Sequence, residues 1–578
     1  ASFAQRERLF RLPRSSWADY DRALMSKGGG VWARTEKSIA LSDEARAALG
    51  IEAQRLTPAQ LVSAILRAPV DLLYNGGIGV YIKSSEETHA QVGDRANDAV
   101  RIDACELRVK VLVEGGNLGC TQRGRIEAAQ SGVRLYTDAI DNSAGVDASD
   151  HEVNIKILLG LAQAQGRLDR SGRDALLAQM TDEVAQLVLR DNIYQTQVLS
   201  LKRDWGARHI DAHARLIRFL EKAGRLNRTI EHLPAEDEFA ERKEKNQGLT
   251  GPELAVVLAY SKMWLYDELL ASQEPEDPWV ATALTRYFPQ RLRMQYADLM
   301  VHHPLAREIT ATHVVNSMVN RVGPSFVHQL VEVTGASAAQ VVRAYLLARE
   351  VYGLVSVWPL IEVVDPSAGT WIPWAVQVQM LDALWRLTFE ATAWFVRSRC
   401  LHEPMGPTQQ RFAAAVAALR QRAEPVAVPS EWVEAGVSEA LAQRVAQLPT
   451  LFAALNIAQV AHDGGVSVEQ AVEVHVGLER CLALSAVRAR IVGLKAHSHW
   501  DSAAKTALAD DLSDLQQAMA RRVLAQAGED VAAQLSSWQE ATGAHFARAA
   551  GRLAELAEVK RADLAMLSVA LRELKHLV

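Results

Sequence analysis

The chain has few cysteines and no long apolar run. Its four cysteines, Cys105, Cys120, Cys400 and Cys481, are spread over 578 residues, and none forms a Cys-x-x-Cys pair. So few thiols argue against a disulfide scaffold and favour a reducing compartment. The longest apolar stretch, near 351–360, is too short to span a bilayer, and the charged first residues lack a signal-peptide core. We therefore expect a cytoplasmic protein with no membrane association.

A large excess of charge of either sign is also absent. The sequence has 63 lysines and arginines against 69 aspartates and glutamates, a formal net charge of -6. No face is forced to be basic, so a nucleic-acid partner is disfavoured. The apolar fraction of 49% is ordinary for a globular protein. At roughly 150 residues per domain, the length predicts two to four domains.

Strand alternation disappears beyond about residue 160, and proline disappears after Pro449. Helical periodicity replaces the alternation. The segment 249–255 (Leu-Thr-Gly-Pro-Glu-Leu-Ala) combines a capping box at Thr250 with apolar residues at helical spacing. Because proline interrupts helices, the proline-free stretch can hold long ones. We expect residues 161–578 to form an all-helical C-terminal domain.

Residues 1–160 show an α/β pattern instead. Apolar runs predict strands at 70–74, 109–113 and 133–136, each followed by a turn rich in glycine or asparagine. A capping box at Thr57 predicts a helix before the first strand, and a charged stretch near 86–100 predicts a helix before the second. Alternating strands and helices with short connections indicate a parallel sheet, which binds ligands at the carboxyl ends of its strands.

Several local motifs have a simpler interpretation than the functional one. Gly76-Gly77-Ile78-Gly79 follows a strand, but the third-glycine position of a dinucleotide fingerprint holds Ile82. The glycine-rich segment 26–30 is not a P-loop, because its lysine precedes the glycines, and an exposed loop is expected there. His209 and His213 have a metal-binding spacing, yet a solvated helix face is the favoured interpretation. We expect no metal site.

The turns after the three strands are more informative. Asn75, Asn117 and Asn142 each follow a predicted strand and lie beside glycine or another small residue. Glycine lets a backbone approach a ligand closely, and a carboxamide can both donate to and accept from ribose hydroxyls or a nicotinamide amide. Asparagine also simply favours turns. The spacing alone leaves both interpretations open.

The amino-acid sequences of these turns resemble those of a known superfamily. Segment 114–117 (Glu-Gly-Gly-Asn) is similar to the Glu-Gly-Ala-Asn turn of the glutamate/leucine/phenylalanine/valine dehydrogenases. Segment 138–146 resembles their Pro-Asp-x-x-Ala-Asn-Ala-Gly-Gly-Val motif without the proline, and 71–77 resembles their Asp-x-x-x-Pro-Ala-Ala turn. Within that superfamily, 92–98 and 318–321 look like the bacterial large-subunit NAD-dependent glutamate dehydrogenases. The resemblance covers essentially the whole chain.

The resemblance implies a fold and a set of site residues. Residues 1–160 would be the second half of a Rossmann-like dinucleotide-binding domain. Asn142 would lie near the nicotinamide and Asn117 near its ribose, while Gly76 and Gly77 would bring backbone to the cofactor, NAD. Ser149 would help to hold the side-chain carboxylate of the substrate. Two departures affect substrate contact: asparagine replaces proline at 75, and Asp-His at 150–151 replaces an aromatic pair.

The resemblance also implies what this chain lacks. The catalytic lysine and aspartate of the family belong to a preceding substrate domain, so we expect no catalytic residue here and a fragment of a longer protein. The implied parent is a homo-oligomer that converts L-glutamate, NAD and water to 2-oxoglutarate, ammonia and NADH. One alternative is a helical regulatory or assembly module without activity of its own. A second is a sister branched-chain amino-acid dehydrogenase, which Ser149 argues against, because an apolar pocket gains nothing from a buried hydroxyl.

Overall fold

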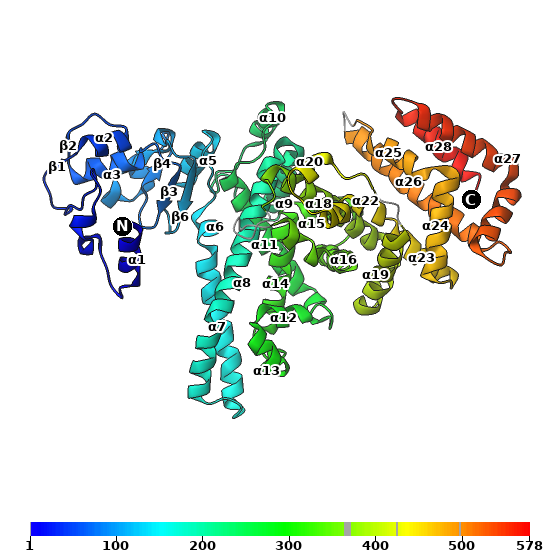
Figure 1. Ribbon diagram of the computed structural model, residues 1–578, viewed down its shortest axis with the longest axis horizontal. Helices are drawn as coiled ribbons and strands as arrows, with labels where there is room; N and C mark the ends of the chain where they lie inside the picture. The colour runs from blue at the N-terminus through cyan, green and yellow to red at the C-terminus, as the bar shows by residue number, and fades with distance from the viewer. Residues whose placement is uncertain (1, 363–370, 423–425, 496–498) are drawn as a thin grey trace. The chain divides into compact units, whose positions relative to one another are not determined.

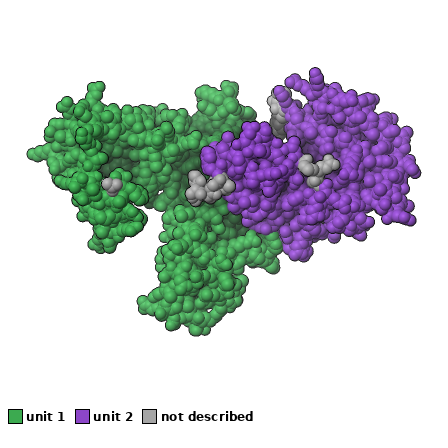
Figure 2. All heavy atoms as spheres, in the orientation of Figure 1, with its two compact units in different colours: residues 1–329 green, residues 330–578 purple. Residues whose placement is uncertain are grey.

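The computed structural model describes residues 2–362, 371–422, 426–495 and 499–578. The chain divides into two compact units, residues 1–329 and 330–578, coloured separately in Figure 2. Strands occur only in the first 114 residues of the described ranges, and every regular element after them is helical (Figure 1). The all-helical prediction for 161–578 is confirmed for the part of that segment that the structure describes.

The first unit begins with short strands and helices and continues into long helices. Its strands are β1 (Ile39–Ala40), β2 (Arg55–Leu56), β3 (Leu72–Asn75), β4 (Ile82–Lys83), β5 (Ile102–Asp103) and β6 (Val111–Glu114). Its helices are α1 (Ser2–Arg11), α2 (Asp43–Leu49), α3 (Pro58–Leu66), α4 (His89–Val92), α5 (Gln122–Gln130), α6 (Asp138–Asp141), α7 (Ser143–Ala164), α8 (Arg170–Asp204), α9 (Ile210–Lys222), α10 (Glu236–Glu244), α11 (Gly251–Ala271), α12 (Thr282–Tyr287), α13 (Gln290–Met300) and α14 (Ala306–Val322), and α15 (Phe326–Thr334) crosses the division.

A small parallel sheet forms the centre of the strand region. β3 pairs in parallel with β6, from Leu72 opposite Val111 to Asn75 opposite Glu114. β6 continues to the third predicted strand through one parallel bridge, between Val111 and Arg134. The predicted order of three parallel segments is therefore present, but the third is a single bridge rather than a strand over 133–136.

The apolar core of this sheet lies between the strands and α5. Its members come from β4, β5, β6 and the segments next to them: Ile82, Ile102, Ala104, Val109, Leu112, Cys120, Ala128, Val133 and Leu135. One face of β3 is uncovered, since Leu72 and Tyr74, which share that face, are 55% and 63% exposed. Among the described strands, β6 alone pairs with β3. An open edge with exposed apolar side chains is what half of a larger sheet presents.

Two predicted helix starts are confirmed by their caps. Thr57 accepts from the Gln60 amide and begins α3 with a complete capping box, and the Thr250 box begins α11 in the same way. The charged helix predicted over 86–100 is wrong. Only α4 and a 3-10 turn at Arg95–Asn97 form there, because Thr88 caps a single turn that Gly93 ends in a left-handed conformation. Local capping therefore overrode the helical pattern.

The helices α7 and α8 pack along each other and share a core with α12 and α13. This cluster comprises Ile155, Leu158, Leu159, Ala162, Leu176, Met180, Leu284, Tyr287, Phe288, Leu292, Tyr296, Leu299, Met300 and Ile309. α7 runs continuously through residue 160, and the cluster draws on residues from both sides of it. These four helices, α7, α8, α12 and α13, are called the helical arm. The arm therefore begins in the turn that follows the sheet.

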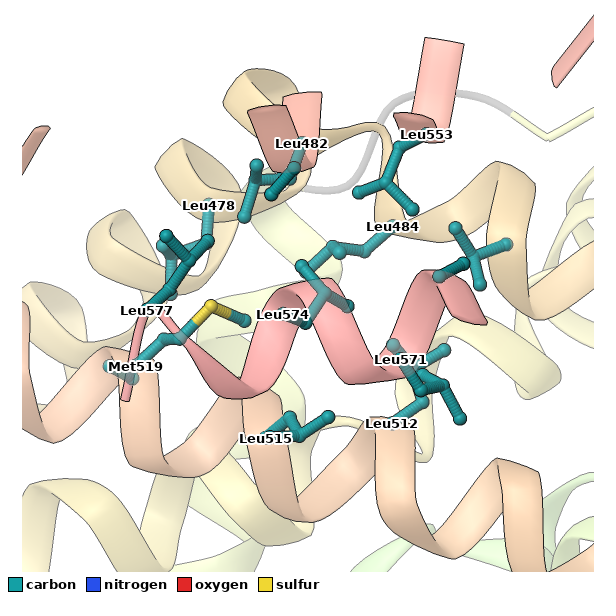
Figure 3. Packing of buried hydrophobic residues seen from close by; sticks show 14 of the residues in the cluster. Leu478, Leu482, Leu484, Leu512, Leu515, Met519, Leu553, Leu571, Leu574 and Leu577 are labelled. Atoms are coloured by element: carbon teal, nitrogen blue, oxygen red, sulfur yellow. The ribbon is translucent and has the colours of Figure 1, made fainter. Parts of the chain in front are cut away.

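The second unit is helical throughout its described residues. Its helices are α16 (Ala338–Val351), α17 (Trp358–Ile361), α18 (Trp374–Arg397), α19 (Met405–Arg422), α20 (Ser430–Glu434), α21 (Glu439–Ala446), α22 (Leu448–Leu451), α23 (Ala454–Gly464), α24 (Val468–Leu482), α25 (Leu484–Val492), α26 (His499–Leu524), α27 (Val531–Glu558) and α28 (Leu564–Lys575). Leucines from α24, α26, α27 and α28 fill its C-terminal core, and Leu478, Leu512 and Leu574 belong to this cluster (Figure 3). Long helices occupy the proline-free stretch, as predicted.

Among the described residues, no single helix has the length and apolar composition needed to cross a membrane. One bent pair, Ala338–Val351 with Leu354–Ile361, passes a test of length and composition only.

Candidate functional site

The turns that follow β3 and β6 meet at the carboxyl edge of the sheet. The amides of Gly115 and Gly116 donate to the Asn75 carbonyl oxygen over 2.9 and 3.2 Å. A Cβ added at Gly116 would clash with the Gly77 carbonyl oxygen and lie 3.0 Å from its carbon. Only glycine allows this approach of one backbone to the other. The two predicted turns therefore form one continuous surface.

The turn between α6 and α7 is attached to the same edge by two carboxylates. Asp141 accepts from the Glu114 amide and Asp138 from the Leu118 amide, both over 2.8 Å. Leu118 has a φ of 59°, an uncommon conformation for a side chain other than glycine or asparagine. These bonds bring the third predicted turn beside the first two. The sequence motif contained both aspartates, yet their role in joining the turns was not predicted.

A buried ion pair between Arg125 and Glu114 supports the junction of the β6 turn with the α6–α7 turn. Arg125 on α5 donates to both carboxylate oxygens of Glu114, over 2.6 and 2.9 Å, and also lies 3.1 Å from Asp138. Glu114 also accepts from the Cys120 amide over 3.0 Å. Burial raises the pKa of Asp141 to about 6, although the Glu114 amide donates to it. The sequence placed Glu114 in a turn motif but gave no sign of its buried partner.

The predicted cofactor residues all lie on or beside this edge. Gly76, Gly77 and Asn117 are exposed in their turns, and Asn142 is partly buried at the break between α6 and α7. The carboxamides of Asn117 and Asn142 make no hydrogen bond to any residue that the structure describes. The Asn75 Nδ2 atom is buried and likewise has no partner in the described part of the chain. Amide groups without partners at a strand edge suit a polar ligand.

Ser149 lies on α7, two turns beyond this edge. It is exposed, and it is seven residues after Asn142, so the two share one face of the helix about 10 Å apart along its axis. The next two residues are turned differently. Asp150 accepts from the Tyr287 hydroxyl over 2.8 Å, and the His151 ring stacks on that of Tyr287 with centroids 4.2 Å apart. The pair that replaces the aromatic residues of the superfamily motif thus packs toward the helical arm.

A further motif supports the loop after β3. Asp94 accepts from the Val80 amide over 2.8 Å and from the Asn97 side chain over 2.7 Å. Gly79 has a φ of 114°, and a Cβ there would clash with the Asn97 amide nitrogen. The segment 92–98, which carried part of the family resemblance, therefore shapes the backbone that leads out of the first turn.

The two histidines with metal-binding spacing do not form a solvated face. His209 and His213 are 5% and 1% exposed, so that prediction is wrong. Burial and, to a smaller extent, the charge of Lys202 lower the pKa of His213 to about 3. His209 ends a 3-10 turn and His213 lies in α9, and both rings face the interior of the first unit, which the spacing alone could not reveal. The described residues contain no group of three or more side chains that could hold a metal ion.

Comparisons with known proteins match both parts of the chain. Residues 1–202 match the family model for the catalytic domain of bacterial NAD-glutamate dehydrogenase, and residues 246–576 match the model for the C-terminal region of glutamate dehydrogenase. Relatives named NAD-specific glutamate dehydrogenase include those of Halomonas elongata (41% identical over 589 residues), Pseudomonas aeruginosa (42% over 589) and Mycobacterium tuberculosis (38% over 594). Each alignment covers all of this chain but 36% of the relative.

Proposed function

Because the chain belongs to the bacterial NAD-specific glutamate dehydrogenase family, we propose that it supplies the nicotinamide-side wall of the cofactor site in a longer glutamate dehydrogenase. The parent would oxidise L-glutamate with NAD and water, giving 2-oxoglutarate, ammonia and NADH. When bound, the nicotinamide accepts the hydride that leaves the substrate, and water then hydrolyses the resulting imine. The residues of this chain would bind and orient the cofactor, while the acid-base groups would come from elsewhere in the parent.

The meeting of three turns at one sheet edge carries this proposal. In a parallel sheet the carboxyl ends of the strands form the ligand crevice. Here that edge combines the side-chain-free backbone of Gly76 and Gly77 with the carboxamides of Asn117 and Asn142. The buried Asn75 Nδ2 atom without a partner adds a donor at the same edge. This donor set fits ribose hydroxyls and the nicotinamide carboxamide, with Asn117 toward the ribose and Asn142 toward the nicotinamide.

The substrate would approach along the exposed face of α7. Ser149 shares that face with Asn142, and a hydroxyl there can donate to the side-chain carboxylate of glutamate. A branched apolar substrate would gain nothing from that hydroxyl, which disfavours the sister dehydrogenases. In this proposal residues 1–160 form the cofactor part and residues 161–578 the helical part. The parent would be a homo-oligomer.

An additional role belongs to the helical part. All the predicted site residues lie in the first unit, and the second unit has a large apolar core of its own. A core of this size, separate from the site, favours a regulatory or assembly role for residues 330–578 beside the catalytic role of the parent. Truncation of the parent after residue 334, the end of α15, would test it, because loss of assembly with retained cofactor binding is the expected result.

Replacing Asn142 with alanine in the full-length parent tests the site. The substitution removes about one or two hydrogen bonds worth ~1 to 1.5 kcal/mol each, so the catalytic efficiency with NAD should fall roughly ten- to a hundredfold. Asn227→Ala is a matched control, because Asn227 only accepts from the Thr229 and Ile230 amides in a turn. Unchanged cofactor kinetics with a lower melting temperature for Asn142→Ala would show that Asn142 is merely a turn residue.

A further inference from the structure

The helix α8 reaches the turn that carries Asn142. Asn192, near the middle of α8, donates from Nδ2 to the Ile140 carbonyl oxygen and to the Ser143 hydroxyl oxygen, both over 2.8 Å. A carboxamide nitrogen has two hydrogens, and both are used here. The two acceptors lie on either side of Asn142 in the chain. One side chain from the long helix therefore holds the α6–α7 break from both ends.

Local hydrogen bonds hold the backbone of the break but not the Asn142 side chain. Asn142 is neither in α6 nor in α7, with φ of -102° and ψ of 16°. Its amide donates to the Asp138 carbonyl oxygen and its own carbonyl accepts from the Gly145 amide, so its backbone is occupied, while its carboxamide has no hydrogen-bond partner among the described residues. A Cβ at Gly145 would lie 2.6 Å from the Asn142 Oδ1 atom, so glycine there leaves space for the carboxamide. The direction of this carboxamide thus depends on how the break is held.

We infer that Asn192 is a positioning residue that orients the Asn142 carboxamide for the cofactor, an inference that rests on the proposed function. Ligand-contacting groups need a supporting shell that fixes their direction, and a small misplacement reduces rate strongly. The two bonds from Asn192 provide that shell at the one place where the helix is interrupted. The helical arm, through α8, therefore takes part in cofactor orientation as well as in packing.

A second contact between α8 and the sheet region provides a matched control. Thr196 and Ser200 lie one and two turns beyond Asn192 on α8. The Tyr136 hydroxyl donates to the Thr196 carbonyl oxygen over 3.1 Å and contacts the Ser200 hydroxyl. This contact joins the same helix to the end of the third parallel segment but does not touch the α6–α7 break. Tyr136→Phe removes it without altering a residue of the proposed site.

The test uses the full-length parent with Asn192→Ala, Ser143→Ala and Tyr136→Phe. Kinetics with NAD, NADH affinity by fluorescence and the melting temperature are measured for each. Asn192→Ala should lower the catalytic efficiency with NAD and weaken NADH binding by roughly tenfold, since two hydrogen bonds are lost. Ser143→Ala, which removes one acceptor, should give a smaller loss. Tyr136→Phe should lower the melting temperature while both cofactor readouts stay within about twofold of the parent.

A double-mutant cycle with Asn142→Ala separates positioning from stability. If Asn192 acts through Asn142, then Asn192→Ala should change the efficiency by less than about twofold once Asn142 is already alanine. Additive effects, or a loss of melting temperature alone as in Tyr136→Phe, would overturn the inference. If Asn142→Ala lowers efficiency while Asn192→Ala does not, only this inference fails. If Asn142→Ala itself has no effect, the site assignment fails and this inference with it.

Discussion

The carbonyl group of Gly77 lies directly against the α-carbon of Gly116, at the point where two parallel strands end. The two glycines differ in what surrounds them. A Cβ at Gly116 would clash with the Gly77 backbone, whereas a Cβ at Gly77 would meet nothing within 4 Å. Gly116 is therefore required by the fold, while the space beside Gly77 is open. A substitution at Gly77 can therefore change cofactor binding without changing the stability of the fold.

We expect Gly77→Ala to weaken cofactor binding without destabilising the protein. The added methyl group would project into the space where the cofactor comes close to the protein backbone. The NADH affinity of the parent should therefore fall roughly tenfold or more. The melting temperature should stay the same or rise slightly, because alanine restricts the unfolded chain more than glycine does. Gly160→Ala, which is also unhindered but lies in α7 away from the edge, is the control. Equal NADH affinity in both variants would contradict the site.

Arg125→Met should destabilise the first unit severely. It leaves the Glu114 carboxylate, which is 1% exposed, without its cation, and breaking a buried pair in this way typically costs about 3–5 kcal/mol. Urea unfolding of the chain followed by circular dichroism measures the loss. The double variant Arg125→Met/Glu114→Leu should recover part of it, because the buried Glu114 charge is removed, and the recovery is incomplete because Asp138 still loses its ion pair with Arg125. A loss below about 1 kcal/mol in the single variant would show that the pair is solvated.

His213→Leu should make the protein more resistant to acid. Both ring nitrogens of His213 are buried and have no hydrogen-bond partner in the described residues. Burial lowers the pKa of His213 from 6.5 to about 3, so the unfolded state takes up the proton first. The stability contributed by the neutral ring is therefore complete above pH 6.5 and lost as the pH falls toward 3. Melting temperatures between pH 7 and 4 should decline less in the leucine variant than in the parent, and parallel declines would refute the prediction.

The isolated 578-residue chain should show no glutamate-dependent NADH production. The family resemblance places the catalytic lysine and aspartate in a preceding substrate domain of the parent. An assay of the purified chain with glutamate and NAD, beside the full-length parent at equal molarity, decides this. Measurable turnover by the chain alone would mean that its own residues include the acid-base groups.

Local signals in the sequence predicted the elements that depend on neighbouring residues alone. The capping boxes at Thr57 and Thr250 gave the correct starts of α3 and α11, because a cap is formed by side chains three residues apart. The three glycine- and asparagine-rich turns were found in the same way. The proline-free stretch after Pro449 correctly indicated long helices, since nothing in it interrupts the backbone hydrogen bonds.

Tertiary structure alone decided how these pieces support one another. Asp141 reaches the Glu114 amide across 27 positions, and Asn192 reaches Ile140 across 52. Neither pairing has a local signature, because a hydrogen bond between distant segments depends on how helices and strands pack. The burial of His213 was missed for the same reason, since a helix pattern shows which residues share a face but not which neighbour covers it. The sequence thus determined the turns and their chemistry, and packing determined which of them meet and what holds them in place.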